Sequence, residues 1–206
     1  MRYLVIFLLG CYSILGQSIT NLNIGDIDTV SERDQILNGL SSGDVRVYTS
    51  SSNIVVDIAI EYSGSNKLIF ESGSHIYIRK NVTAGSLVFK AEDNIYLDRT
   101  SVTLTTNNTD STNGMLVLSA NYKNSGNGAP LYSEAFTINT NGGNVYLGGG
   151  NDTGTSYPNA TDWNGIEFNG LTINSNGGDV EIRGESDNSN GIYFNGSTTI
   201  RSSGGD

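Results

Sequence analysis

Short apolar runs that alternate with polar residues fill the chain from Gly43 onward. They are separated by Gly, Asn, Ser and Asp, the residues that favour turns. The runs are Val45–Val47, Ile54–Val56, Leu68–Phe70, Ile76–Ile78, Leu87–Phe89, Ile95–Leu97, Val102–Leu104 and Leu116–Leu118. A period of two is typical of strands, and no stretch after residue 40 has a convincing helical period. The pattern predicts an all-β chain.

The runs return at fixed intervals, which indicates stacked repeats. The segment Leu68–Ile78 returns as Leu87–Leu97, 19 residues later, and Asn164–Gly170 returns as Asn190–Gly196, 26 residues later. A unit of about 20 residues with two or three short strands is one turn of a parallel β-helix. Each unit then buries its apolar face on its neighbour.

The longest echo joins Thr137–Leu147 to Thr172–Ile182. A third copy opens at Thr199 and stops at Asp206, before its Val-x-Ile, so we expect the repeats to be truncated at the C-terminus. The longer intervals predict loops inserted at corners, over residues 124–130 and 148–162, since surface insertions cost little closure entropy.

We therefore predict a right-handed parallel β-helix, with irregular corner loops, over residues 43–206. A β-sandwich built from hairpins is the alternative, because it would also have short strands and Asn-Gly turns. It would not, however, need the same tripeptides at equal offsets.

Parallel stacking places like residues above one another. The expected inward pairs are Leu68 with Leu87 and Phe70 with Phe89, and the expected outward pair is Tyr77 with Tyr96. Tyr146 occupies the same place in its own Val-Tyr-Leu phrase. Tyr77, Tyr96 and Tyr146 are thus a candidate ladder for stacking on sugar rings, although a ladder that only steadies the sheet explains them as well.

The first 42 residues differ from the repeats. Residues 1–16 are short and apolar behind Arg2, as in a cleaved secretory signal peptide. Lipidation at Cys11, which follows Leu-Leu-Gly, is the alternative. Residues 17–42 are expected to form an N-terminal cap, with one or two helical turns over Ser31–Leu37, Ser31 as N-cap and Asp34 near the positive end of the helix dipole.

The net charge of the chain excludes some classes of binding partner. The formal net charge is −10, and beyond residue 123 only Arg183 and Arg201 are basic, against nine acidic residues. Such a surface argues against nucleic-acid binding and against docking on an anionic membrane. After signal cleavage we expect no membrane insertion. If Cys11 leaves with the signal, the mature chain has no cysteine and so neither disulfides nor thiolate chemistry.

Some β-helices act on polysaccharides and need acidic and basic side chains grouped on successive turns. The candidates for such a group are Asp57, Glu61, Arg79, Lys80, Asp98 and Arg99. Stacking would bring Arg79 to Asp98 and Lys80 to Arg99. A solvated ion pair between coils is the simpler explanation.

Metal binding has weaker support. His75 is the only histidine and has no second histidine or mature cysteine to share a metal, so we expect it at the surface. Gly148–Asp152 is similar to one imperfect copy of a calcium-binding nonapeptide, whereas such repeats work in tandem. We expect no metal and no cofactor.

The repeats resemble the filamentous-haemagglutinin-like β-helical adhesins and exoproteins of bacteria. Gly85–Leu97 and Asn141–Leu147 carry the phrases typical of that family, and the resemblance covers residues 43–206. It implies host or matrix glycans or proteins as partners, and outer-membrane secretion machinery for export. The Asn-Pro-Asn phrases of that family's export domain are lacking, since the only prolines are Pro130 and Pro158.

The expected function is that of a non-catalytic, secreted or cell-surface module of a larger adhesin-like protein, structural or adhesive in role. A polysaccharide-active β-helix enzyme, of lyase or hydrolase type, is the alternative.

Overall fold

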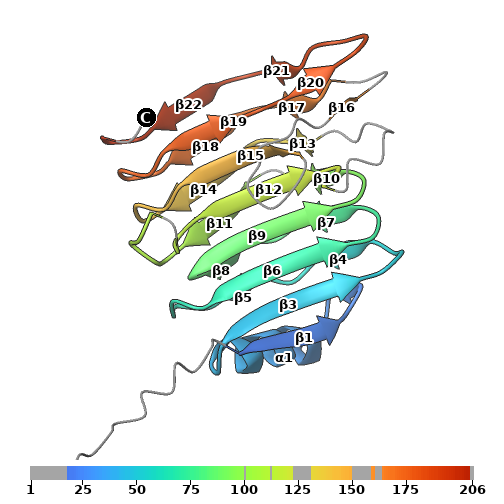
Figure 1. Ribbon diagram of the computed structural model, residues 1–206, viewed down its shortest axis with the longest axis vertical. Coiled ribbons are helices and arrows are strands. Elements are labelled where there is room, and N and C mark those ends of the chain that lie inside the picture. Colours follow the sequence, from blue (N-terminus) through green and yellow to red (C-terminus); the bar gives the residue numbers. More distant parts are fainter. Residues whose placement is uncertain are drawn as a thin grey trace, which may run out of the picture.

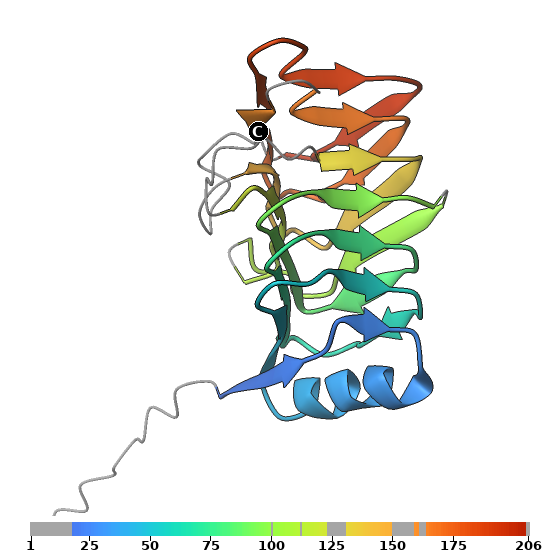
Figure 2. The ribbon, with the colours of Figure 1, turned by 90° about the vertical axis from the view of Figure 1, so that its right-hand side faces the viewer.

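The computed structural model describes residues 18–99, 101–111, 113–122, 131–149, 159–160 and 164–204. In this part the chain winds upward as a right-handed coil with three parallel sheets along its sides (Figures 1 and 2). The predicted parallel β-helix is confirmed, and the sandwich alternative is wrong, because neighbouring strands of each sheet pair in parallel and come from successive coils.

The first sheet, in front in Figure 1, has the longest strands. Its strands in spatial order are β1 (Ile19–Asn23), β3 (Asp44–Thr49), β6 (Lys67–Ser72), β9 (Ser86–Ala91), β12 (Leu116–Ala120), β15 (Val145–Gly149) and β19 (Val180–Ile182). They alternate inward apolar residues with outward residues, as the period of two requires.

The second sheet faces the viewer in Figure 2. It contains β2 (Asp26–Ile27), β4 (Ile54–Val56), β7 (Ile76–Ile78), β10 (Ile95–Leu97), β13 (Leu131–Ser133), β17 (Ile166–Phe168) and β21 (Ile192–Phe194).

The third sheet completes each coil. It contains β5 (Ile60–Glu61), β8 (Val82–Ala84), β11 (Val102–Thr106), β14 (Phe136–Thr140), β18 (Leu171–Asn174) and β22 (Thr198–Arg201). A separate pair joins β16 (Asn159–Ala160) to β20 (Glu185–Ser186).

The core is a column of stacked like residues. Leu68 pairs with Leu87 and Phe70 with Phe89, as predicted. The two phenylalanine rings are fully buried and stacked, with centroids 4.8 Å apart and planes 8° apart. Packing of this kind adds to the gain from removing apolar area from water.

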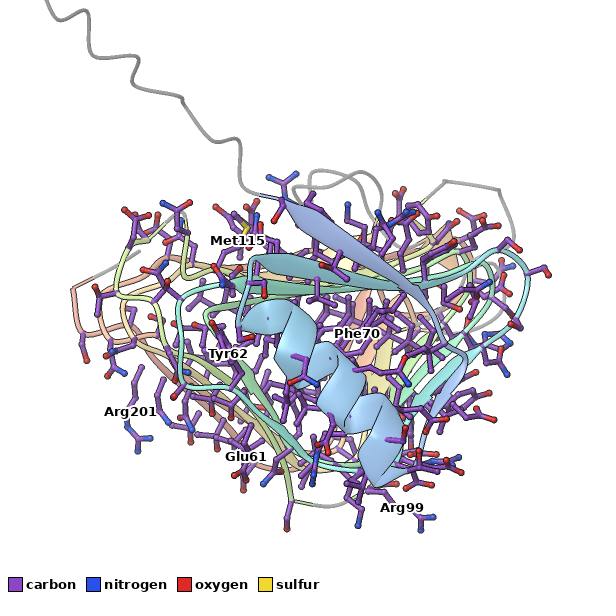
Figure 3. All side chains as sticks on the ribbon, turned by 90° about the horizontal axis from the view of Figure 1, so that it is seen from below. Glu61, Tyr62, Phe70, Arg99, Met115 and Arg201 are labelled. Atoms are coloured by element: carbon purple, nitrogen blue, oxygen red, sulfur yellow. The ribbon has the colours of Figure 1, made fainter. Side chains whose placement is uncertain are left out.

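A helix covers the N-terminal end of the coil. Figure 3, seen from below, shows α1 (Val30–Leu40) lying across the opening between the sheets. Ile36 and Leu40 point into the core and are fully buried.

The predicted position of the helix start was wrong by two residues. The N-cap is Thr29, not Ser31, because Thr29 and Glu32 form a capping box: the Thr29 side chain accepts from the Glu32 N–H, and the Glu32 carboxylate accepts from the Thr29 N–H. Glu32 rather than Asp34 is the acid of the first turn. The helix is also longer than the predicted one or two turns.

The segment expected to be a cap therefore contains strands as well as a helix. Strands β1 and β2 pair with β3 and β4. The signal peptide expected over residues 1–16, with Cys11, lies outside the described residues. So does the corner loop expected over 124–130. Of the loop expected over 148–162, Gly148 and Gly149 belong to β15, and residues 159–160 form β16.

The recurring Gly-Gly phrase has two physical causes. The first glycine of each copy takes a positive φ, +100° at Gly142 and +109° at Gly177. The second glycine lies too close to the coil below for a side chain: a Cβ on Gly143 would be 1.8 Å from the Gly114 carbonyl oxygen, and one on Gly178 would be 2.2 Å from that of Gly143.

A buried hydroxyl closes each of these turns. Thr140 donates to the carbonyl of Gly143 at 2.5 Å, and Thr106, its partner in the coil below, donates to that of Gly114 at 2.6 Å although its own turn lacks the Gly-Gly phrase. Ser175 does the same to Gly178. The phrase Thr/Ser-x-Gly-Gly thus recurs because the hydroxyl satisfies a buried carbonyl and the second glycine lets successive turns approach.

We expect Gly143→Ala to lower the free energy of unfolding by about 3 kcal/mol or more, because its Cβ would force two backbone turns apart. Urea denaturation followed by circular dichroism measures the change. Gly25→Ala is the matched control, since its Cβ would come no closer than 3.3 Å to the Asn53 carbonyl oxygen. Equal losses in the two variants would contradict the stacking explanation.

Candidate functional site

A row of tyrosines runs up the outside of the second sheet. Tyr77, Tyr96 and Tyr132 are the middle residues of β7, β10 and β13, and they pair in register. The Tyr77 and Tyr96 rings stack with centroids 5.0 Å apart and planes 13° apart, which confirms the predicted pair. Tyr132 follows at 6.4 Å from Tyr96, with its ring plane tilted by 59°.

The placement of Tyr146 in this row was wrong. Tyr146 lies in β15 of the first sheet, where it pairs with Val117 and Glu181. Its Val-Tyr-Leu phrase is similar to Ile76–Ile78 and Ile95–Leu97, with tyrosine between two aliphatic residues, but so short a pattern occurs on more than one side of the coil.

Sequence reasoning missed Tyr132. Its phrase, Leu131-Tyr132-Ser133, has a buried serine where the others have Leu or Ile, and its distance from Tyr96 does not match the 19-residue interval. The Tyr132 hydroxyl donates to the Glu134 carboxylate at 3.3 Å and accepts from the Asn169 amide at 2.9 Å. Beyond it, Glu167 and Tyr193 continue the same outward column.

His75 lies beside the row and is partly exposed, in line with its expected surface position. Its ring meets the Tyr77 and Tyr96 rings edge-on, with centroids 6.0 and 5.9 Å away. The Asn94 N–H donates to His75 Nδ1 at 3.3 Å. Through these contacts His75 packs against the edges of both rings and stabilises their positions.

A column of charged side chains follows the row on its C-terminal side. The Arg79 guanidinium donates to the Asp98 carboxylate, with Nε 3.1 Å from Oδ2, as predicted. Arg79 Nη1 also lies 3.6 Å from Asp57 Oδ2, and the guanidinium carbon lies 5.5 Å from the Tyr77 ring centroid. Each exposed pair contributes little stability, but together they fix the position of Arg79.

Lys80 and Arg99 lie next to this column and are exposed. Together with Asp57 and Arg79 they line a hollow of about 330 Å³. The predicted proximity of Lys80 and Arg99 is confirmed to this extent. Among the described residues, no carboxylate forms an ion pair with either side chain.

Glu61 does not belong to this group. It lies at β5 of the third sheet and lines a different hollow, with Tyr62, Ser63, Thr83 and Asn107. Figure 3 shows Glu61 and Arg99 at separate places on the rim of the coil. The grouping of all six candidate residues was therefore wrong. Glu61 belongs to a strand of the third sheet, whereas the other five directly follow strands of the second sheet.

In the described ranges, no three His, Cys, Asp or Glu side chains are close enough together to hold a metal ion. Of the candidate calcium segment, Gly148 and Gly149 lie within β15, and Gly150 to Asp152 lie outside the described residues.

Burial changes the acidity of two members of the row. Desolvation raises the pKa of Tyr77, and the nearby Tyr96 and Asp98 add to the increase. Desolvation also raises the pKa of Tyr132, with Glu134 as the second cause. Both phenols therefore stay neutral to a higher pH than an exposed tyrosine does.

No protein-family model matches the chain, and no curated protein or solved structure shows significant similarity to it. Within the part of the chain that the structure describes, no helix has the length and apolar character needed to cross a membrane.

The raised pKa of Tyr77 predicts a loss of stability at alkaline pH. The stabilisation is fully present below the tyrosine pKa of the unfolded chain, about 10, and it is lost as the pH rises through the folded value. Unfolding free energies measured between pH 8 and pH 11 should therefore fall with pH, and less steeply in Tyr77→Phe. Identical slopes in the two proteins would contradict the assignment.

Proposed function

We propose that the chain is a non-catalytic structural and adhesive module of a secreted or cell-surface protein, and that the second sheet is its glycan-binding face. The observation that carries this proposal is the linear array on that sheet. Tyr77, Tyr96 and Tyr132 rise one coil at a time beside Arg79, Asp98 and Glu134. Aromatic rings next to a few fixed polar groups suit the recognition of a sugar chain.

The parallel coil suits a structural role. Seven strands of the first sheet, spaced by about 4.8 Å, span roughly 30 Å along the axis. Their backbone bonds form continuous ladders, and successive coils stack as in other solenoids. Such a coil holds a binding face at a fixed distance and orientation.

The three rings do not contribute equally. Tyr77 and Tyr96 cover one another's faces, so a sugar ring cannot lie between them. Tyr132 is tilted away from Tyr96, and its hydroxyl is oriented by Glu134 and Asn169. We therefore assign the main sugar contact to Tyr132, and the support of the row to Tyr77 and Tyr96.

We expect Tyr132→Ala to weaken glycan binding about fivefold to tenfold, the loss of one aromatic contact of about 1 kcal/mol. A polysaccharide array identifies the ligands, and calorimetry measures the affinities. Tyr146→Ala on the first sheet is the matched control and should bind as the unmodified chain does. A chain that binds no glycan, or equal losses in both variants, would overturn the proposal.

The hollow beside Arg79 favours a polysaccharide-active enzyme as the second candidate, because it brings acidic and basic groups together. A proton acceptor, however, needs a carboxylate that is free to accept. Asp57 and Asp98 are both held by Arg79.

We therefore expect no release of reducing ends or unsaturated uronates from a panel of uronate polysaccharides. Colorimetric and ultraviolet assays of the full chain, run over hours, provide the measurement. If product appears and Asp98→Asn abolishes it, the chain is an enzyme and the non-catalytic assignment is wrong.

A further inference from the structure

Resting on the glycan-binding face proposed above, we infer that its ligand is an acidic polysaccharide with one carboxylate on each sugar, and that Lys80 and Arg99 bind these carboxylates. Neither side chain has a described carboxylate partner, and both line the hollow next to the tyrosine row. Their charges are thus available to a ligand.

The position of the two cations is unusual for this chain. The molecule carries a net charge of −10, yet three of its eleven Lys and Arg residues line this one hollow. Arg79 is neutralised by Asp57 and Asp98, which lie 3.6 and 3.1 Å from it. Lys80 and Arg99 remain as the uncompensated pair.

Their spacing matches a repeating polymer. Tyr77 pairs with Tyr96 across adjacent coils, and Lys80 and Arg99 each follow three residues later. The two cations therefore stand one coil apart along the axis, about 4.8 Å at the backbone. That rise is close to the length that one pyranose adds to an extended chain, so each of these two coils would meet one carboxylate.

The tyrosine row has the same direction and the same period. It lies about three residues from the cations, roughly 10 Å along an extended strand. A sugar chain that runs parallel to the axis would have its carboxylates beside Lys80 and Arg99. Its hydroxyl groups would lie over Arg79 and Asp98, which offer hydrogen-bond donors and acceptors respectively.

The surrounding charges favour a carboxylated chain over a sulfated one. Asp57 lines the hollow and Asp98 lies 3.1 Å from Arg79, so these three side chains leave one net negative charge, which Lys80 and Arg99 offset. A polymer with a single charge on each sugar meets this balance, whereas a densely sulfated polymer brings several charges to each coil. The planar fork of Arg99 also matches a carboxylate in two-point contact.

The test compares polygalacturonate with the same polymer after full methyl esterification, which removes the charge and keeps the sugar backbone. Calorimetry on the full chain should show about tenfold weaker binding of the ester. The double variant Lys80→Ala/Arg99→Ala should bind polygalacturonate about tenfold more weakly than the unmodified chain, and bind the ester unchanged. Each lost exposed charge contact accounts for a factor of up to about five.

The control is Lys67→Ala/Arg201→Ala, which removes the same two charges from the first and third sheets. Figure 3 shows Arg201 away from Arg99. The control should keep its affinity for polygalacturonate. Exchanging the two cations, Lys80→Arg/Arg99→Lys, should also retain most of the binding. Circular dichroism and melting curves verify that all variants are folded.

Four results would overturn the inference. Equal binding of polygalacturonate and its ester would show that the glycan site is indifferent to charge, leaving the proposed function intact. Equal losses in the test and control variants would assign the effect to overall charge. Tighter binding of dextran sulfate than of polygalacturonate would make the site a general polyanion site. Failure to bind any glycan would remove the proposed function itself.

Discussion

The structure depends on one constraint, the in-register stacking of each coil on the coil below. Parallel pairing places Phe70 over Phe89 and Tyr77 over Tyr96, so any residue chosen at one level must suit its copies above and below. At the turns the same constraint allows only glycine, since a Cβ on Gly143 would meet the Gly114 carbonyl oxygen. The repeated phrases of the sequence are thus the direct expression of contact between coils.

Stacking also explains how columns of interacting side chains arise on the outside of the coil. A side chain outside a strand meets the equivalent side chain of the next coil, and a column forms along the axis. Arg79 meets Asp57 below and Asp98 above, so its positive charge is fully compensated. In the first sheet, Arg46 donates to Glu71 in the same way, which holds the pKa of Glu71 below its usual range. No carboxylate among the described residues pairs with Lys80 or Arg99, and this difference makes their hollow a candidate ligand site.

In the tyrosine row, face-to-face stacking has two opposing effects. Rings that stack face to face stabilise adjacent coils and at the same time cover the surfaces that a sugar would use. Only the tilt of Tyr132 breaks the pattern, and its hydrogen bonds to Glu134 and Asn169 hold it there. In the proposed glycan-binding face, the same row therefore divides into a supporting part, Tyr77 and Tyr96, and a contacting part, Tyr132.

The period of two and the 19-residue interval between Leu68 and Leu87 were enough to determine the fold, the core pairs and the Arg79–Asp98 contact, because these depend only on offset along the chain. Which side of the coil a phrase occupies was decided by the tertiary structure. Tyr146 lies in a phrase similar to that of Tyr96 but belongs to the first sheet, and Tyr132 joins the row despite an irregular interval. Corners of variable length shift the count of residues without shifting the stack, so register in space, and not spacing in sequence, decides which side chains meet.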